Sequence, residues 1–238
     1  AVGSNPANAT DPLVGLFIAN DGADVEGGGS MDNPLQTIEF ALAVFENTNL
    51  ETVALFLQGG DYPEDVALLP GVSLIGMDGA EARLIGTISG AGGAILENLD
   101  VVAPEGNATL LDLDNGAMRL HKVRFIGSAD DRSATGILAT GTGPADALIS
   151  ECSFIDLAVG IDIAGDAPLI RRCEFIDPSI AGIRIQAGAQ VGENGALGLE
   201  GDAGSGFNRF VFRTDIPDPI ENPVAIINLS DTEIVMEN

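Results

Sequence analysis

The chain has 238 residues, 45% of them hydrophobic, and carries 36 acidic against 10 basic residues, for a formal net charge of −26 at pH 7. This balance argues against a nucleic-acid partner, because binding to a phosphate backbone requires clustered lysine and arginine. No apolar run approaches the roughly 20 residues that a membrane-spanning helix needs, so membrane insertion is not expected either.

The first fifty residues predict a strand, a loop and a helix. Residues 16–19 are apolar and indicate a strand, and the Gly- and Asp-rich segment 20–30 that follows is typical of a turn-forming loop. Beyond it, apolar residues have the spacing of one helix face: Ile38, Ala41, Leu42 and Phe45. We therefore expect an amphipathic helix over residues 37–46.

A seven-residue pattern occurs four times in the middle of the chain. Its first, fourth, sixth and seventh positions are apolar, whereas the second, third and fifth are mostly polar. The copies begin at Leu96, Leu120, Ile149 and Ile170, which lie 24, 29 and 21 residues apart. Val191 begins a possible fifth copy. A period in this range, built of short strands, is typical of a solenoid whose coils stack on one another.

A shorter apolar motif follows each copy and helps to define the type of solenoid. It spans residues 111–113, 137–139, 161–163 and 183–185. A glycine precedes the last three: Gly136, Gly160 and Gly182. No unit has room for a ten-residue helix, and no asparagine recurs where a leucine-rich repeat would place it. The pattern therefore predicts an all-β fold, a single-stranded parallel β-helix. Because an open solenoid end exposes apolar core and strand edges, the helix is expected to cap the N-terminal end.

Equivalent residues of successive coils are expected to stack about 4.8 Å apart inside the solenoid. One predicted inward ladder contains Leu99, Val123, Cys152 and Cys173. The other contains Val101, Phe125, Phe154 and Phe175. The two cysteines would then be close enough for a disulfide, although their parallel directions favour two packed thiols. An oxidising extracellular location favours the disulfide, so both states stay open.

The segment 53–76 carries two phrases, Gly-x-Tyr-x-Glu-x-Val and Gly-Val-x-Leu-x-Gly. Upstream residues match a Gly-x-Asp, Pro-x-x-Thr-Ile-x-x-Ala opening: Gly22, Asp24, Pro34, Thr37, Ile38 and Ala41. These features resemble the pectin-lyase-like right-handed parallel β-helix family, and most closely a β-helix domain of unassigned function in secreted bacterial surface proteins and lipoproteins. The resemblance covers about residues 16–190. It implies a right-handed coil, whereas the activities that this fold hosts are too varied to transfer.

The sequence divides into three parts of one structural domain. Residues 1–50 hold the strand, the loop and the capping helix, and residues 51–213 hold the β-helix coils. Residues 214–238 form an irregular segment with a closing coil, in which residues 225–229 and 233–236 are expected to be strands.

Outward-facing carboxylates recur along the predicted coils: Asp100, Asp112, Glu151, Asp156, Asp162, Glu174 and Asp177. A β-helix lyase would also need a basic residue that removes a proton beside a uronate carboxylate. However, Arg172 and Arg184 occupy positions opposite Glu151 and Asp162 on neighbouring coils, where oppositely charged side chains pair. No catalytic residue is therefore predicted.

Calcium is the cofactor that the carboxylates would favour. Asp156 and Asp177 are expected to stack on adjacent coils, and Asp21 and Asp24 lie in the Gly-rich loop. Carboxylate oxygens are preferred calcium ligands, and these four residues are the predicted metal site. Two other interpretations remain, namely a solvated acidic surface and Asp residues that only shape turns.

The predicted function is that of a non-catalytic extracellular module. Such a module would serve cell-surface display, bind carbohydrate or cations, or assemble with copies of itself into an envelope layer or fibre. The alternative is a calcium-dependent polysaccharide lyase or glycoside hydrolase that acts on an extracellular polysaccharide. The chain starts at Ala1 without methionine, which indicates a processed N-terminus and agrees with an extracellular or cell-surface location.

Overall fold

The computed structural model describes residues 3–4, 14–79, 81–90, 92–106, 108–113, 118–141, 147–189, 208–212 and 224–229. Within them the strands form three sheets. The first sheet contains, in spatial order, β1 (Gly3–Ser4), β2 (Val14–Ile18), β3 (Val53–Leu57), β6 (Val72–Gly76), β9 (Ile95–Glu97), β12 (Arg119–His121), β15 (Leu148–Ser150) and β18 (Leu169–Arg171). The second contains β4 (Gly60–Tyr62), β7 (Ala82–Ile85), β10 (Asp100–Val102), β13 (Arg124–Ile126), β16 (Ser153–Ile155), β19 (Glu174–Ile176) and β21 (Arg209–Val211). The third contains β5 (Val66–Ala67), β8 (Ile88–Ser89), β11 (Thr109–Leu113), β14 (Thr135–Ala139), β17 (Val159–Ile163), β20 (Ala181–Ile185) and β22 (Val224–Asn228).

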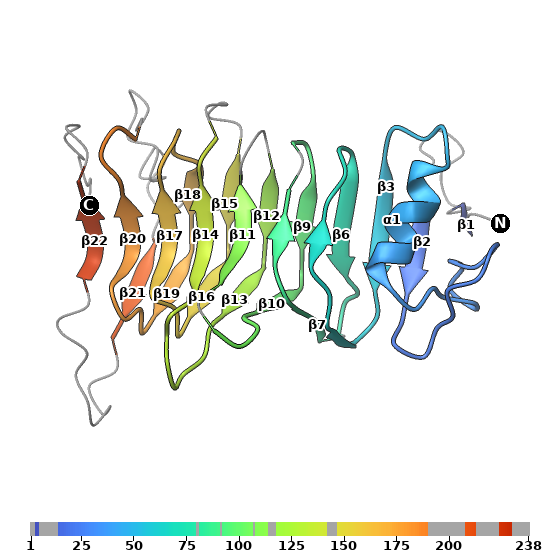
Figure 1. The fold of residues 1–238 in the computed structure, drawn as a ribbon, viewed down its shortest axis with the longest axis horizontal. Coiled ribbons are helices and arrows are strands. Elements are labelled where there is room, and N and C mark those ends of the chain that lie inside the picture. The colour runs from blue at the N-terminus through green and yellow to red at the C-terminus, as the bar shows by residue number, and fades with distance from the viewer. Residues whose placement is uncertain are drawn as a thin grey trace.

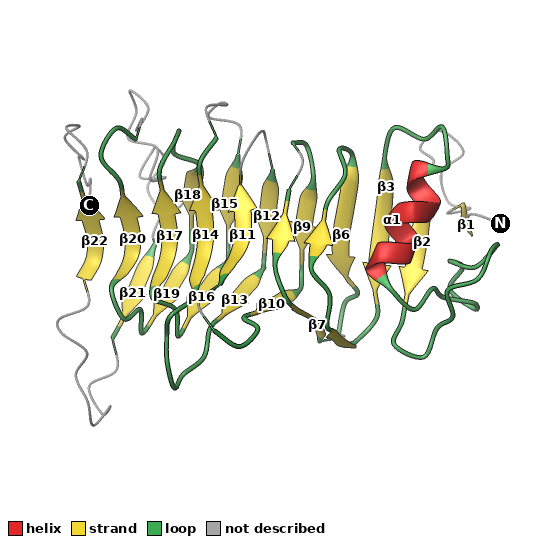
Figure 2. Cartoon of the chain, in the orientation of Figure 1, coloured by secondary structure: helices red, strands yellow, loops and turns green. Residues whose placement is uncertain are grey.

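From β3 to β20 the chain visits the three sheets in turn, so each circuit adds one strand to each sheet (Figure 1). Neighbouring strands are parallel in every sheet, except that β1 runs antiparallel to β2. This arrangement is consistent with the predicted parallel β-helix. Strands account for almost all of the regular structure of the described residues, which contain one helix, near the N-terminal end (Figure 2).

Each seven-residue copy spans one corner of the coil. The first two residues end a strand of the first sheet, and the last three form a strand of the second sheet. The residue between the first strand and the buried fourth position has a left-handed backbone, with φ between 51° and 55°, at Asn98, Lys122, Glu151 and Arg172. A left-handed residue turns the chain sharply within one position, which explains why so short a pattern can change sheets.

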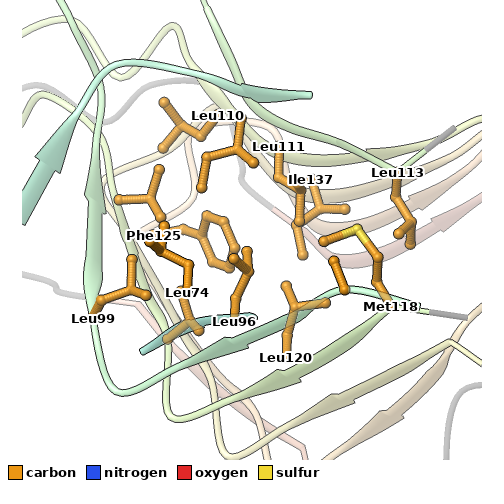
Figure 3. Close-up of a cluster of buried hydrophobic side chains, with 14 of the residues drawn as sticks. Leu74, Leu96, Leu99, Leu110, Leu111, Leu113, Met118, Leu120, Phe125 and Ile137 are labelled. Carbon is orange, nitrogen blue, oxygen red and sulfur yellow. The ribbon is translucent and has the colours of Figure 1, made fainter. Parts of the chain in front are cut away.

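The two predicted ladders lie in the core. Leu99, Val123, Cys152 and Cys173 are all buried. The rings of Phe125 and Phe154 stack with centroids 5.2 Å apart, and those of Phe154 and Phe175 stack at 4.8 Å. Phe210 of β21 extends this stack at 4.9 Å from Phe175. Figure 3 shows side chains of all three sheets pointing toward one another in one cross-section, with Phe125 among the leucines.

The shorter apolar motif forms the core of the third sheet. Leu111 pairs with Ile137, Ile137 with Ile161, and Ile161 with Ile183 in consecutive parallel strands. Equivalent positions of the motif are therefore register partners in neighbouring strands of this sheet. Val191 and residues 233–236, for which the sequence predicted a further repeat and a strand, lie outside the described residues.

The helix α1 spans Ile38–Glu46, close to its predicted extent, and lies beside β2 and β3 (Figure 1). Its buried face consists of Ile38, Ala41, Leu42 and Phe45, which belong to the hydrophobic core. Three side chains accept hydrogen bonds from backbone N–H groups at its start. Asp24 accepts from Gln36 and Thr37, Glu64 accepts from Ile38 and Glu39, and Thr37 accepts from Phe40. Donors that a helix start leaves without partners are thereby satisfied.

The short strand β1 pairs with β2 only at Val14 and Gly15, and the chain that follows β2 covers the rest of its outer edge. The backbone N–H of Phe17 donates to the carbonyl of Gly29, and the N–H of Leu35 donates to the carbonyl of Phe17. Paired in this way, the edge of the first sheet offers fewer free backbone groups to another chain.

Candidate functional site

A column of charged side chains runs along the outer face of the second sheet, one per strand. In spatial order it contains Asp61, Arg83, Asp100, Arg124, Ser153, Glu174 and Arg209. The signs alternate, with the single interruption at the serine. Arg124 binds Asp100 with two hydrogen bonds of 2.6 Å and 2.5 Å, and Arg83 lies 3.0 Å from Asp61. Most charged side chains of the column therefore form ion pairs that connect neighbouring coils, and they are not free to act as catalytic groups.

The two ion pairs predicted for Arg172 and Arg184 are present. Arg184 Nε donates to Asp162 Oδ1 at 3.0 Å, a second nitrogen of Arg184 contacts Asp162 Oδ2, and Gln186 donates to the same carboxylate at 2.8 Å. Arg172 lies 3.5 Å from Glu151. The hydrogen bonds that Arg184 donates to the Asp162 carboxylate raise the pKa of Arg184 above its ordinary value, so its charge is permanent.

Four of the carboxylates that the sequence analysis placed on the outer surface are buried. The exposed fraction is 5% for Asp100, 8% for Asp156, 3% for Asp162 and 3% for Asp177. Asp100 and Asp162 lie in strands, whereas Asp156 and Asp177 follow the ends of β16 and β19. Arginines pair with Asp100, Asp156 and Asp162. Such burial could not be read from strand alternation, which reports the direction of a side chain and not what covers it.

Asp156 and Asp177, two of the four predicted calcium ligands, occupy equivalent left-handed positions on adjacent coils, with φ of 52° and 50°. The predicted stacking is thus present. Arg132, from the loop before β14, places its Nε 3.6 Å from Asp156 Oδ1. Ser179 holds this loop by donating to the carbonyl of Arg132 at 3.0 Å. The described residues contain no group of three or more His, Cys, Asp or Glu arranged to hold a metal, so calcium at this corner stays a prediction.

The other predicted calcium ligands lie in the Gly-rich loop. The carboxylate of Asp24 accepts three hydrogen bonds, from the backbone of Gln36 and from the backbone and hydroxyl of Thr37, at 2.7 to 3.1 Å. Asp21 is exposed. Asp24 therefore has a structural role at the start of α1.

A surface groove of ≈ 570 Å³ lies at the corner between the first and second sheets. We call it the corner groove, and its lining residues are Gly79, Glu81, Ala82, Asn98, Leu99, Asp100, Lys122, Arg124, Glu151 and Ser153. Lys122, the only lysine of the chain, is exposed and forms no ion pair with any described residue. Lys122, Glu81 and Asn98 were not among the site residues predicted from the sequence. The signal available was that Asn98 and Lys122 share the polar third position of the repeat.

A second groove of ≈ 450 Å³ adjoins the first on the outer face of the first sheet. We call it the aromatic groove, and it is lined by Phe17, Phe56, Ile75, Gly76, Met77, Asp78, Glu97 and Asn98. The rings of Phe17 and Phe56 stack on neighbouring strands, with centroids 5.2 Å apart. Asn98 lines both grooves, and its side-chain amide donates to the carbonyl of Gly76 at 2.9 Å. The two grooves therefore meet at a fixed side chain.

Cys152 and Cys173 are free thiols in the core. Cys152 Sγ donates to the carbonyl of Ser150 at 3.3 Å, and Cys173 Sγ donates to that of Arg171 at 3.3 Å. The hydrogen bond with Cys152, together with burial, raises the pKa of the Cys173 thiol. Both cysteines are only 1% exposed, so neither thiol is accessible to a substrate and neither is a candidate nucleophile.

Comparison with known proteins adds no family to these observations, because no protein-family profile, no characterised protein and no solved structure matches the chain. In the part of the chain that the structure describes, no helix is long and apolar enough to cross a membrane.

Proposed function

We propose that the protein is a non-catalytic extracellular module whose corner groove binds a polysaccharide. The observation that carries the proposal is the joining of two grooves at Asn98, which gives a surface with hydrogen-bonding groups at one end and aromatic rings at the other. Sugars present hydroxyl groups and apolar ring faces together, and sites that bind them combine polar and aromatic side chains for the same reason.

The groove is built on a rigid base. Asn98 and Lys122 occupy left-handed turns between paired strands, and Asp100 is held by two hydrogen bonds from Arg124. Rigid binding groups need little reordering when a ligand binds, which increases affinity. The same pairing supports a non-catalytic role, because Asp100 and Arg124 neutralise one another and are not available as an acid and a base.

The proposal includes the features implied by the resemblance to pectin-lyase-like proteins. These are a right-handed coil, a helix α1 that caps the N-terminal end, and a cell-surface or secreted location. The buried face of α1, with Ile38, Ala41, Leu42 and Phe45 in the core, supports the capping role. Calcium at Asp156 and Asp177 is part of the same proposal.

Binding can be tested by affinity electrophoresis and calorimetry with soluble xylan, β-glucan, polygalacturonate and chitosan oligosaccharides. The diagnostic variant is Lys122→Asn, because asparagine tolerates the left-handed backbone at this position. Arg171→Asn is the control, since it removes one positive charge from an exposed residue that lines neither groove. We expect Lys122→Asn to weaken binding to the best ligand and Arg171→Asn to leave it unchanged. Equal binding by both variants, or binding to none of the glycans, would contradict the proposal.

A polysaccharide lyase is the second candidate, because one observation favours it. Lys122 has no ion-pair partner among the described residues and shares the corner groove with Glu81, Asp100 and Glu151. An amine beside carboxylates could remove the proton that starts β-elimination from a uronate. Release of unsaturated uronides from polygalacturonate by the wild type, with or without calcium, and its loss in Lys122→Asn would replace the non-catalytic proposal with this one.

A further inference from the structure

We propose that the aromatic groove selects glycan units that carry free amino groups, that is, positively charged amino sugars. This inference rests on the proposed carbohydrate-binding function and names the class of glycan. It follows from three features of the groove, namely its floor, its charges and its position relative to the corner groove.

The floor of the groove is apolar and fixed. Phe17, Phe56 and Ile75 occupy one outward column of three adjacent strands and are each half-buried. Phe56 is held close to the sheet because Gly15 lies beneath it: a Cβ atom on Gly15 would lie 2.6 Å from the ring. A firmly held aromatic surface offers a platform for the ring face of a sugar and attracts a cation placed over it.

The charged groups in the aromatic groove are carboxylates. Asp78 and Glu97 line it, and neither forms an ion pair with any described residue. No lysine, arginine or histidine is among its lining residues. Carboxylates beside aromatic rings favour an ammonium group, which gains from both at once.

The position of Glu97 fits a ligand that lies along the solenoid axis. Phe56, Ile75 and Glu97 are register partners on three successive strands. Strand spacing places Glu97 roughly 10 Å from Phe56 along the axis. A glycan that rests on Phe56 and runs toward Asn98 therefore brings its next units beside Glu97 and then into the corner groove.

The net charge of the whole protein also favours cationic glycans over anionic ones. With a net charge of −26, the protein repels uronate polymers and raises the local concentration of cationic ones. Lys122 in the corner groove would disfavour an ammonium group there, so the amino-sugar unit is assigned to the aromatic groove and hydroxyl contacts to the corner groove.

A pair of ligands with one backbone, in which the amine is either free or acetylated, provides the test. Oligomers of β-1,4-linked glucosamine and their fully N-acetylated counterparts share one backbone, and only the former are cationic at mildly acidic pH. In calorimetric titrations at fixed ionic strength we expect the free-amine oligomer to bind about tenfold more tightly than the acetylated one. Raising the pH until the amines are neutral should remove the difference.

Variants separate the groove from the general charge of the protein. Glu97→Gln and Phe56→Leu should each weaken binding of the free-amine oligomer about fivefold. Glu105→Gln, the same change at an exposed residue outside both grooves, should not. Melting curves confirm that each variant is folded.

Each possible outcome supports or contradicts a defined statement. If both oligomers bind equally and Lys122→Asn weakens both, carbohydrate binding stands and the amino-sugar inference is overturned. If Glu97→Gln and Glu105→Gln bind alike, the attraction is due to net charge alone, which also overturns it. If no glycan binds, the proposed function itself is wrong.

Discussion

Gly136 lies directly against the ring of Phe154 on the next coil. A Cβ atom at this glycine would lie 2.9 Å from Cδ1 of Phe154 and 2.5 Å from the carbonyl oxygen of Gly160. The same relationship recurs one coil later, where a Cβ atom on Gly160 would lie 2.6 Å from Cδ1 of Phe175. The periodic glycines and the periodic phenylalanines are thus two sides of one packing contact, in which the absence of a side chain admits each ring.

The first prediction concerns this contact. Phe154→Ala removes the ring between Phe125 and Phe175 and leaves a cavity, so we expect the free energy of unfolding to fall by about 3–5 kcal/mol. Denaturant titration measures the change. Phe212→Ala, at a ring that is 38% exposed, is the control and should change stability by only about 0.5 kcal/mol. A similar loss in both variants would show that the stack does not stabilise the core.

The repeat made much of the fold predictable from the sequence. Because register partners recur at fixed positions of the motif, the ladder of Phe125, Phe154 and Phe175 could be assigned from the spacing of the motif alone. Opposite charges at equivalent positions of neighbouring coils likewise predicted the ion pairs of Arg172 with Glu151 and of Arg184 with Asp162. These successes share one cause, which is that a parallel solenoid translates periodicity in sequence directly into contact in space.

Contacts outside the repeat could not be predicted in this way. Arg132 reaches Asp156 from a loop, and Glu64 reaches the start of α1 from the segment between β4 and β5. Neither position recurs, so no periodicity marks it. The grooves could not be predicted for a related reason. They form where the side chains of Asn98, Lys122 and their neighbours leave a hollow on the surface, and such a hollow depends on the three-dimensional packing and not on any periodic pattern in the sequence.

The second prediction compares two ion pairs that differ in burial. Arg184→Ala leaves the carboxylate of Asp162 buried with Gln186 as its remaining partner, and should cost about 1–3 kcal/mol of stability. Arg172→Ala breaks a pair whose side chains are 53% and 38% exposed, and should cost at most about 1 kcal/mol. Denaturant titrations of both variants under the same conditions give the order. An equal cost would mean that burial does not determine the strength of these pairs.

The third prediction concerns alkaline pH and Tyr62. Burial and the nearby Glu64 and Asp21 raise the pKa of Tyr62 to about 12, and its hydroxyl donates to the carbonyl of Gln58 at 2.8 Å. The protonated form is thus favoured in the folded state. Its contribution to stability is fully present below the unfolded pKa of about 10 and is lost as the pH rises toward 12.

Tyr62 is the only tyrosine and the chain has no tryptophan, so the near-ultraviolet absorbance of tyrosinate reports this group alone. We expect a midpoint near pH 12 in the folded protein and near 10 in denaturant. The same midpoint in both states would contradict burial of the hydroxyl.

The fourth prediction concerns the two cysteines. Because Cys152 and Cys173 are buried free thiols, a thiol reagent should label neither at an appreciable rate in the native protein and both after unfolding. Cys173→Ser provides the calibration, since it should yield one reactive thiol in denaturant. Failure to label the denatured wild type, reversed by reductant, would show that the pair is a disulfide instead.

The last prediction tests calcium at the corner formed by Asp156 and Asp177. If the ion binds there, calcium should raise the melting temperature above that in EDTA at matched ionic strength, because a ligand that binds only the folded state stabilises it. Arg132 competes with the ion, since its guanidinium lies 3.6 Å from Asp156. The gain should therefore be larger in Arg132→Ser than in the wild type.

Two further variants assign the calcium effect to a site. Asp156→Asn combined with Asp177→Asn should abolish the gain, whereas Asp21→Asn should abolish it only if the Gly-rich loop is the site. Matched sodium solutions correct for screening of the net charge of −26, which any cation provides. Identical melting in calcium and EDTA for the wild type and Arg132→Ser would remove calcium from the proposed function. Arg132 would then be the counterion of the Asp156 carboxylate, because its guanidinium is the cation that lies beside that group.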